Sequence, residues 1–324
     1  MLTARNRRKF GIQKEWEQAG YFETQRAKDL SADIIQSIKE GRLITVTGPV
    51  GVGKTVMMRE LRTHPQFKQE VIFARALSID KPQLRLSALI TALFLDLAGD
   101  PDLKIPAQSE RRERLLQTAI HNAGKPVALC IDEAHDLNPS TLNGLKRLLE
   151  TLDTGSGTLA IVLIGHPRLH HDLQRPTMEE IGHRTRRLIL ENMGNDTASD
   201  IDWLFTQCLR KNIPTDEIIE PEARAFLADK LQTPLQIAEH LDRAFADAYR
   251  TGADKVTRAI VESTISVGFE DLDARLARIG TAPKTRASQF DLSHAETRRF
   301  LKGRLDTDRT AELTDLMRST GLPL

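Results

Sequence analysis

An eight-residue stretch near the start of the chain has the spacing of a phosphate-binding loop. GPVGVGKT (48–55) matches the pattern G-x-x-x-x-G-K-[S/T] at every fixed position, between the strand-like RLITVT and the helix-like TVMMRELR. Its glycines allow a tight turn that points backbone N–H groups at phosphate oxygens. We expect Lys54 to contact the β- and γ-phosphates and the Thr55 hydroxyl to bind Mg²⁺. The predicted nucleotide-binding residues are Gly48, Pro49, Val50, Gly51, Val52, Gly53, Lys54, Thr55 and Val56 and, from the next motif, Asp132.

A pair of acidic residues follows an apolar run in the middle of the chain. VALCIDEAH (127–135) predicts a buried strand that ends at Asp132 and Glu133. Asp132 would hold the Mg²⁺ directly or through water, and Glu133 would orient and polarise the attacking water, which favours hydrolysis of ATP. An ordinary acidic strand end is the alternative. DEAH (132–135) is also a helicase string, but a two-motor helicase needs a second strand series, which is not found in 194–324.

A second apolar run ends in a histidine. TLAIVLIGHPRL (158–169) predicts another buried strand, which ends at Gly165 and His166. In ATPases with an added strand between the P-loop strand and the acidic strand, that added strand ends in a polar sensor. His166 would detect the γ-phosphate and the attacking water there; a strand-end histidine with a local hydrogen bond is the alternative. We expect a structural or coupling role for His135.

Three arginines precede the last strand-like segment. They lie in MEEIGHRTRRLILENM (178–193), which predicts a short helix and then a strand. An arginine supplied by a neighbouring subunit can stabilise the charge of the phosphoryl-transfer transition state. Arg184 is our first candidate for such a finger and Arg187 the second, while Arg186 stays open. The alternative is a solvated basic edge.

These residues need a sheet whose strands end at one edge. Between 42 and 193 the sequence alternates strand-like and helix-like segments, which predicts βαβ units and a doubly wound α/β domain. The expected strands are 42–47, 70–76, 126–131, 158–164 and 186–190, and the expected helices are 55–62, 83–97, 111–121 and 141–152.

After Met193 the strand-like runs stop. Four helical segments follow, at 197–212, 221–231, 234–251 and 255–266. Pro221 and Pro234 stand where a first helical turn favours proline. We divide the chain into a basic N-terminal arm (1–20), an α/β nucleotide-binding domain (21–193), a helical lid (194–268) and a C-terminal helical domain (269–324).

The overall composition is that of an ordinary globular protein. The chain has 324 residues, of which 40% are hydrophobic and 28% charged, so it can bury a core. A net charge of +1 and 5% aromatic residues argue against a protein wrapped in nucleic acid and against a base-stacking surface. No apolar run approaches a membrane span, and two cysteines form no disulfide framework. We therefore expect a cytoplasmic protein that does not bind membranes.

Both ends of the chain are locally basic. The segment 284–304 predicts two short helices, the second starting at Ser293 with Glu296 completing a capping box, in a helix-turn-helix-like arrangement whose second helix could enter a major groove. A helix that docks a partner protein is the alternative there, and a solvated terminus is the alternative at the N-terminal end. We expect Trp16, Tyr21 and Phe22 to pack against the nucleotide-binding domain near the adenine rather than to stack on DNA bases. The candidate DNA contacts are Arg5, Arg7, Arg8, Lys9, Arg298, Arg299 and Lys302.

Together these motifs resemble those of AAA+ ATPases. The resemblance is closer to the bacterial group of ExeA-like ATPases and transposition regulators of the TnsC, TniB and MuB kind, and it covers about 20–265. It implies a five-stranded parallel P-loop domain followed by a helical lid. The stretches that carry it are GPVGVGKT (48–55), IDEAHDL (131–137), LKRLLE (145–150), IVLIGHPRL (161–169) and the arginine before RLIL (187–190).

The resemblance also implies a function, and the chain departs from the group's pattern at one position. It implies an ATPase that forms a homo-oligomer, as a ring or a helical filament, on double-stranded DNA, and that recruits or stimulates a transposase, with a target-selection protein as a further partner. An ExeA-like transport-energising ATPase and a helicase or replisome loader are the alternatives. Lid helices of this group often carry an arginine that senses the γ-phosphate, whereas this chain has Leu235 or Gln236 at that position. Hydrolysis would then be slow or depend on a partner.

Overall fold

The computed structural model describes residues 2–75, 85–98, 105–106, 108–152, 157–173, 181, 185–266, 293, 296, 299–300 and 305–319. The first of the two short helices expected in 284–304, and Arg184, Arg298 and Lys302, lie outside these residues. The chain forms two compact units. Unit 1 comprises Met1–Phe22, Pro49–Gly53 and Asn192–Leu324, and unit 2 comprises Glu23–Gly48 and Lys54–Glu191.

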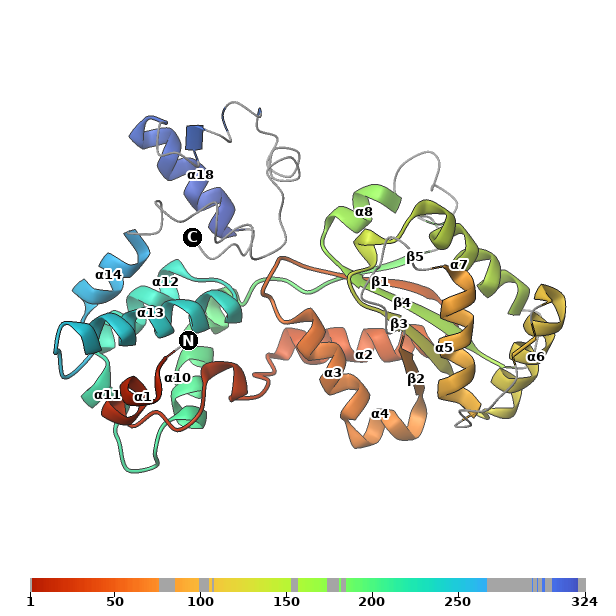
Figure 1. Cartoon of the computed structure of the whole chain (residues 1–324), viewed down its shortest axis with the longest axis horizontal. Coiled ribbons are helices and arrows are strands. Elements are labelled where there is room, and N and C mark those ends of the chain that lie inside the picture. The colour runs from red at the N-terminus through yellow and green to blue at the C-terminus, as the bar shows by residue number, and fades with distance from the viewer. Residues whose placement is uncertain are drawn as a thin grey trace. The chain divides into compact units, whose positions relative to one another are not determined.

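A parallel sheet forms the centre of unit 2 (Figure 1). Among the described residues it has five strands in the order β2-β3-β4-β1-β5. The prediction of a five-stranded parallel α/β domain is therefore confirmed, and each strand lies within two residues of its predicted limits. The strands are β1 (Leu43–Thr47), β2 (Ile72–Arg75), β3 (Val127–Ile131), β4 (Leu159–Gly165) and β5 (Thr185–Ile189).

Helices cover the sheet because its central strands are apolar on both faces. Every residue of β1, β3 and β4 is buried, as expected for a parallel sheet between helical layers. Leu129, Ile161 and Leu163 share a core with residues of α5, α6, α7 and α8, whereas α2 and α3 also pack on β4. The helices are α2 (Gln25–Lys39), α3 (Lys54–Thr63), α4 (Pro65–Glu70), α5 (Leu86–Ala98), α6 (Ser109–Asn122), η3 (Ala134–Asp136), α7 (Pro139–Leu152) and α8 (Arg168–Leu173).

Unit 1 is helical in its described part (Figure 1). Pro221 and Pro234 are the first residues of their helices, as the sequence predicts. The helices pack through an apolar core that includes Phe205 and Phe245, neither of which is exposed. They are α1 (Ala4–Phe10), η1 (Trp16–Gln18), η5 (Gly194–Asp196), α10 (Thr197–Cys208), α11 (Thr215–Ile218), α12 (Pro221–Lys230), α13 (Pro234–Arg250), α14 (Arg258–Ser266) and α18 (Thr307–Ser319).

The N-terminal segment differs from the expected arm. It forms α1, and Phe10 packs against Phe245 with ring centroids 5.0 Å apart. Trp16 contacts Phe205 at a centroid distance of 5.4 Å. The expectation that Trp16 packs against the nucleotide-binding domain is therefore wrong, because the apolar groups of this segment are buried among the helices of unit 1. The nearness of Trp16 to the adenine stays a prediction.

The described part of the tail agrees with the expected helix start. The Glu296 N–H donates to the Ser293 hydroxyl at 3.1 Å, which is the N-cap hydrogen bond that the sequence predicts. Phe300 is fully buried and Arg299 is exposed. Arg309 of α18 pairs with Glu296 at 3.1 Å. These neighbouring side chains therefore differ in exposure, as expected for a helix with one buried and one solvated face.

The structure also bears on the cysteines and on possible membrane spans. Cys130 and Cys208 are both free thiols and buried. Over the residues that the structure describes, no helix combines the length and the apolar character that a bilayer crossing requires.

Unit 1 buries a carboxyl group in α10. Asp200 is 2% exposed, and its Oδ2 atom has no hydrogen-bond partner among the described residues. Burial raises its pKa from 3.8 to about 7, because a carboxylate is disfavoured away from water. The carboxyl group therefore favours folding most below pH 4, and this contribution is lost as the pH rises to about 7.

Replacing Asp200 by asparagine should remove this pH dependence. We expect the Asp200→Asn variant to gain stability over the parent by about 1.4 kcal/mol per pH unit between pH 4 and 7, with no further gain above pH 7. Urea denaturation of both proteins across this range measures the difference. Asp254→Asn, at an exposed position of the same unit, is the control. A gain that does not change with pH would contradict the assigned titration.

Candidate functional site

The phosphate-binding loop connects β1 to α3. Gly51 and Gly53 have φ values of 79° and 96°, in the left-handed region that a residue with a Cβ adopts only at a cost. The Lys54 Nζ donates to the Gly48 carbonyl oxygen at 2.8 Å. The lysine is thus held against the start of the loop, where it can meet phosphate oxygens.

The ammonium group of Lys54 is half-buried. Burial lowers its pKa below the ordinary value, and the carboxylates of Glu133 and Asp132 act in the opposite direction. A cation with little solvation and only partial charge compensation gains most from an anionic ligand. This electrostatic arrangement suits a phosphate ligand.

Two candidate magnesium ligands lie side by side in unit 2. The Thr55 hydroxyl donates to the Asp132 Oδ2 at 2.9 Å. Hydroxyl and carboxylate oxygens are ligands that Mg²⁺ prefers. The residues therefore fit the ion, and we propose that Thr55 and Asp132 hold it. The bound ion would neutralise charge on the β- and γ-phosphates.

Glu133 has an unusual backbone. Its φ is +52°, the single positive value among the described residues other than glycine. Its N–H donates to the Asp132 Oδ1 at 2.9 Å, and its side chain is 57% exposed. A left-handed non-glycine residue costs free energy and is often found at functional sites. The conformation leaves the carboxylate accessible to water, which suits the role we propose for Glu133.

The end of β4 lies beside η3. The His166 N–H donates to the His135 Nδ1 at 3.3 Å, and the two rings are 6.0 Å apart. The His166 Nδ1 accepts from the Arg168 N–H at 3.3 Å, so the local hydrogen bond of the alternative interpretation is present. The sensor role of His166 stays a prediction.

A third histidine, which the sequence analysis missed, supports β1. The His170 Nε2 lies 2.9 Å from the Thr45 Oγ1 and 3.3 Å from the Thr47 Oγ1. Both threonines are buried. A signal for this cluster exists in the sequence, because two hydroxyl residues alternate in an otherwise apolar strand. These hydrogen bonds connect α8 to β1, the strand that leads into the phosphate-binding loop.

The candidate finger arginines differ in their surroundings. Arg186 pairs with Asp33 at 3.4 Å, whereas Arg187 is exposed on β5. Arg184, the first candidate, lies outside the described residues. The finger therefore stays a prediction.

The lid position expected to carry a sensing arginine has a structural role instead. The Gln236 side chain accepts from the Thr233 N–H at 3.1 Å, and the Thr233 hydroxyl accepts from the Gln236 N–H at 3.3 Å. This capping box starts α13 and buries Gln236 completely. Leu235 lies beside Gly51 within unit 1, with its N–H 3.3 Å from the glycine carbonyl oxygen. Neither side chain supplies a positive charge.

Two of the four basic residues of α1 contact other parts of unit 1, and the other two are exposed. Arg7 binds Glu15 at 3.3 Å, and Lys9 donates to the Ala253 carbonyl oxygen at 2.7 Å. Arg5 and Arg8 are exposed. Of the four predicted phosphate contacts in this segment, two are therefore engaged in holding α1 in unit 1.

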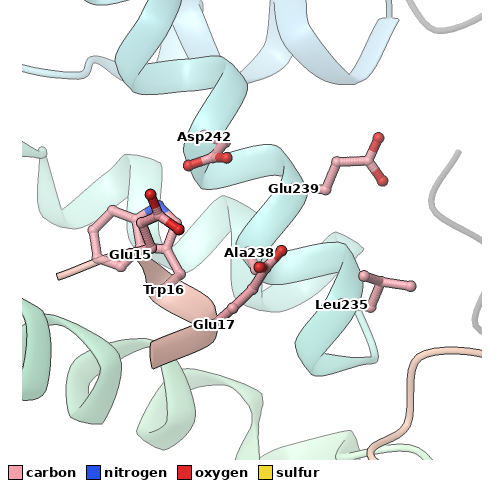
Figure 2. A pocket seen from close by; sticks show the side chains of 7 residues that line it. All are labelled: Glu15, Trp16, Glu17, Leu235, Ala238, Glu239 and Asp242. Carbon is pink, nitrogen blue, oxygen red and sulfur yellow. The ribbon is translucent and has the colours of Figure 1, made fainter. Parts of the chain in front are cut away.

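A hollow of about 220 Å³ lies between η1 and α13 (Figure 2). Trp16, Leu235 and Ala238 form its apolar part. Its remaining lining consists of carboxylates, which repel phosphate, so the hollow is unsuited to the charged part of a nucleotide. These four acidic residues are Glu15, Glu17, Glu239 and Asp242.

Comparison with known proteins identifies the domain around this site. Residues 36–173 match a family model described as "AAA domain". Together with the parallel sheet and the two motifs at its edge, this match is decisive. Residues 36–173 form an AAA+ ATPase domain. The family match, together with the two motifs, indicates an ATPase that uses Mg²⁺ as its cofactor.

General secretion pathway protein A of Aeromonas hydrophila is a relative of this chain. The two are 32% identical over 220 residues, which make up 67% of this chain and 39% of the relative. The chain therefore spans well under half of that protein's length. The similarity supports the ExeA-like side of the expected resemblance and not a TnsC-like identity.

Solved AAA+ structures share the fold. The ORC2 protein of Aeropyrum pernix has a TM-score of 0.55 at 16% identity, over 98% of this chain and 90% of its own. Drosophila ORC bound to DNA has a TM-score of 0.52 at 15% identity, over 96% of this chain and 82% of the other. At such low identity the likeness establishes the fold alone.

Two substitutions should separate nucleotide binding from hydrolysis in the AAA+ domain. Lys54→Ala removes the cation at the phosphates and should weaken ATP binding at least tenfold. Glu133→Gln leaves the phosphate loop intact and should keep the ATP affinity while the hydrolysis rate falls at least a hundredfold. Equilibrium binding of ATP and phosphate release measure the two effects. Hydrolysis by Glu133→Gln at the parent rate would show that Glu133 does not orient the water.

Proposed function

We propose that this chain is an ATP-dependent, DNA-binding regulator of transposition. It assembles as a homo-oligomer on double-stranded DNA in the cytoplasm, recruits or stimulates a transposase, cooperates with a target-selection protein and hydrolyses ATP to reset the assembly. The transposase and the target-selection protein come from the resemblance of the motifs to the TnsC, TniB and MuB kind.

The observation that carries the proposal is the presence of exposed cations on helical elements outside the ATPase sheet. Arg5 and Arg8 are exposed on α1, and Arg299 is exposed beside the buried Phe300. Cations at such positions can bind phosphates without disturbing the site at Lys54. With a net charge of +1, one subunit offers few contacts, so tight binding to DNA requires several subunits.

A second observation supports DNA as the ligand. The chain shares its fold with origin-recognition proteins, one of which is described as bound to DNA. This likeness also keeps a helicase or replisome loader as a candidate. Such a loader would share the ATP-gated assembly on DNA and would differ in its protein partner.

A transport-energising ATPase is the alternative from another class. The observation that favours it is the 32% identity to General secretion pathway protein A. The two functions differ in ligand, because the transport ATPase has no need of duplex DNA. Measurements of DNA binding therefore discriminate between them.

Binding to duplex DNA should be electrostatic and should require ATP. The variant Arg5→Gln, Arg8→Gln, Arg299→Gln should bind more weakly, and the slope of log affinity against log salt should fall by about 2–3 for each bound subunit. The control variant Lys28→Gln, Lys125→Gln, Lys211→Gln loses the same charge at exposed positions elsewhere and should bind as the parent does. Fluorescence anisotropy with and without a non-hydrolysable ATP analogue measures both. Absence of binding by the parent at low salt would favour the transport ATPase.

A finger at Arg184 would make hydrolysis depend on a neighbouring subunit. Arg184→Ala and Lys54→Ala subunits should each be inactive, but a mixture should regain about a quarter of the parent rate, because some interfaces then join an intact loop to an intact finger. Steady-state phosphate release over a series of mixing ratios measures the recovery. If folded, co-assembling subunits show no recovery at any ratio, Arg184 does not act in trans.

A further inference from the structure

One imidazole lies between the acidic motif and the end of β4. The His135 Nδ1 is 3.4 Å from the Glu133 Oε2 and accepts the His166 N–H at 3.3 Å. Its side chain is 21% exposed. We infer that His135 is a positioning residue for hydrolysis, whose ring lies between the carboxylate of Glu133 and the backbone at the end of β4 and sets the surroundings of that carboxylate. The inference rests on the proposed role of Glu133 as the residue that orients water.

The hydrogen bond at Nδ1 determines which nitrogen of the His135 ring carries the proton. A ring nitrogen that accepts a hydrogen bond carries no proton, so the neutral ring has its proton on Nε2. The Nε2 faces Asp136, whose Oδ1 is 3.9 Å away. The Nδ1 therefore has no proton to donate to Glu133. The ring lies beside the Glu133 carboxylate without capturing it, and the carboxylate stays available to accept a proton from water.

The end of β4 leaves room for this ring. A Cβ added at Gly165 would lie 3.1 Å from the His135 Nδ1 and 3.3 Å from the His135 backbone nitrogen. Both distances are shorter than ordinary van der Waals contact. Glycine before His166 thus permits the ring to approach the strand and accept the N–H of the next residue.

The arrangement connects two functional positions that are 33 residues apart in the chain. Glu133 is held by its left-handed backbone on one side of the ring, and His166 contacts the ring through its peptide N–H on the other. A movement of the His166 peptide would change the hydrogen bond at Nδ1 and thereby the surroundings of the Glu133 carboxylate. His135 thus couples the position of the His166 peptide to the surroundings of Glu133, the residue that orients water.

Two amide substitutions at position 135 test this inference. Asparagine places an acceptor where the ring has Nδ1, whereas glutamine places its amide near the position of Nε2. We expect His135→Asn to keep kcat within about twofold of the parent and His135→Gln to lower kcat about tenfold. Both variants should keep the parent's ATP affinity and thermal unfolding temperature. A ring that only fills space would give equal kcat values for the two variants, and this outcome would overturn the inference.

A substitution on the opposite side of the contact tests the same link. Gly165→Ala should displace the ring and lower kcat about tenfold without changing ATP affinity. In a His135→Ala background the same substitution should have a smaller effect, because the methyl group then meets the backbone nitrogen of residue 135 but no ring. Independent effects that multiply would contradict a shared pathway.

A spectroscopic measurement tests the protonation of the His135 ring without depending on ATP hydrolysis. Nitrogen-15 NMR of the full chain with labelled histidine, with and without a non-hydrolysable ATP analogue, reports which ring nitrogen carries the proton. The His135 signal, assigned by its loss in His135→Gln, should show an unprotonated Nδ1 in the nucleotide-free protein. A protonated Nδ1 would overturn the inference. Loss of hydrolysis in Glu133→Gln tests the role of Glu133 separately, so failure of that role is distinguishable from failure of the link to His135.

Discussion

The parallel pairing of β1, β4 and β3 is the constraint on which the site depends. β4 lies between the other two strands, with Thr47 opposite Gly165 and Ile131 opposite Leu163. Because all three strands run in the same direction, their carboxyl ends meet at one edge of the sheet. Thr55, near the start of α3 after β1, and the acidic pair after β3 are therefore neighbours within unit 2, and the Thr55 hydroxyl reaches Asp132.

The same constraint explains the polar groups around the acidic pair. The end of β4 falls between the two motifs, so its Gly165 and His166 meet the turn that follows Asp132. That turn contains a strained Glu133 and a histidine that accepts from the β4 backbone. A buried apolar sheet tolerates such groups only at its edge, where hydrogen bonds satisfy them. Strain, buried charge and histidine contacts therefore concentrate where ATP chemistry is expected.

Strong local patterns made the fold of the nucleotide-binding domain predictable. Long apolar runs between glycine- and proline-containing breaks gave the five strands, and the spacing of GPVGVGKT gave the loop. The neighbourhood of Asp132 and Thr55 followed from the strand direction alone. The contacts of His135 with Glu133 and His166 did not follow, because they depend on the shape of a short turn and on the space beside Gly165.

In the N-terminal segment and the lid, by contrast, the local structure differs from what the sequence predicts. Four cations between 5 and 9 suggested an arm, yet Leu2 and Phe10 on the same segment are buried. Their apolar contacts hold α1 in unit 1, and two of the cations are engaged there. Gln236 was compared with a sensing arginine, but the threonine three residues before it makes it a capping residue. Apolar contacts therefore decide the structure of the N-terminal segment, and a capping box decides the start of α13.

We propose that Thr55 and Asp132 form one divalent-cation site across two strand ends. The affinity of Mn²⁺ for the complex with a non-hydrolysable ATP analogue tests it most directly, measured by electron paramagnetic resonance in the parent, in Thr55→Ala, in Asp132→Ala and in the double variant. Our account predicts that each single substitution weakens Mn²⁺ binding about tenfold and that the double variant loses less than the product of the two. Unchanged Mn²⁺ affinity in either single variant would contradict the account.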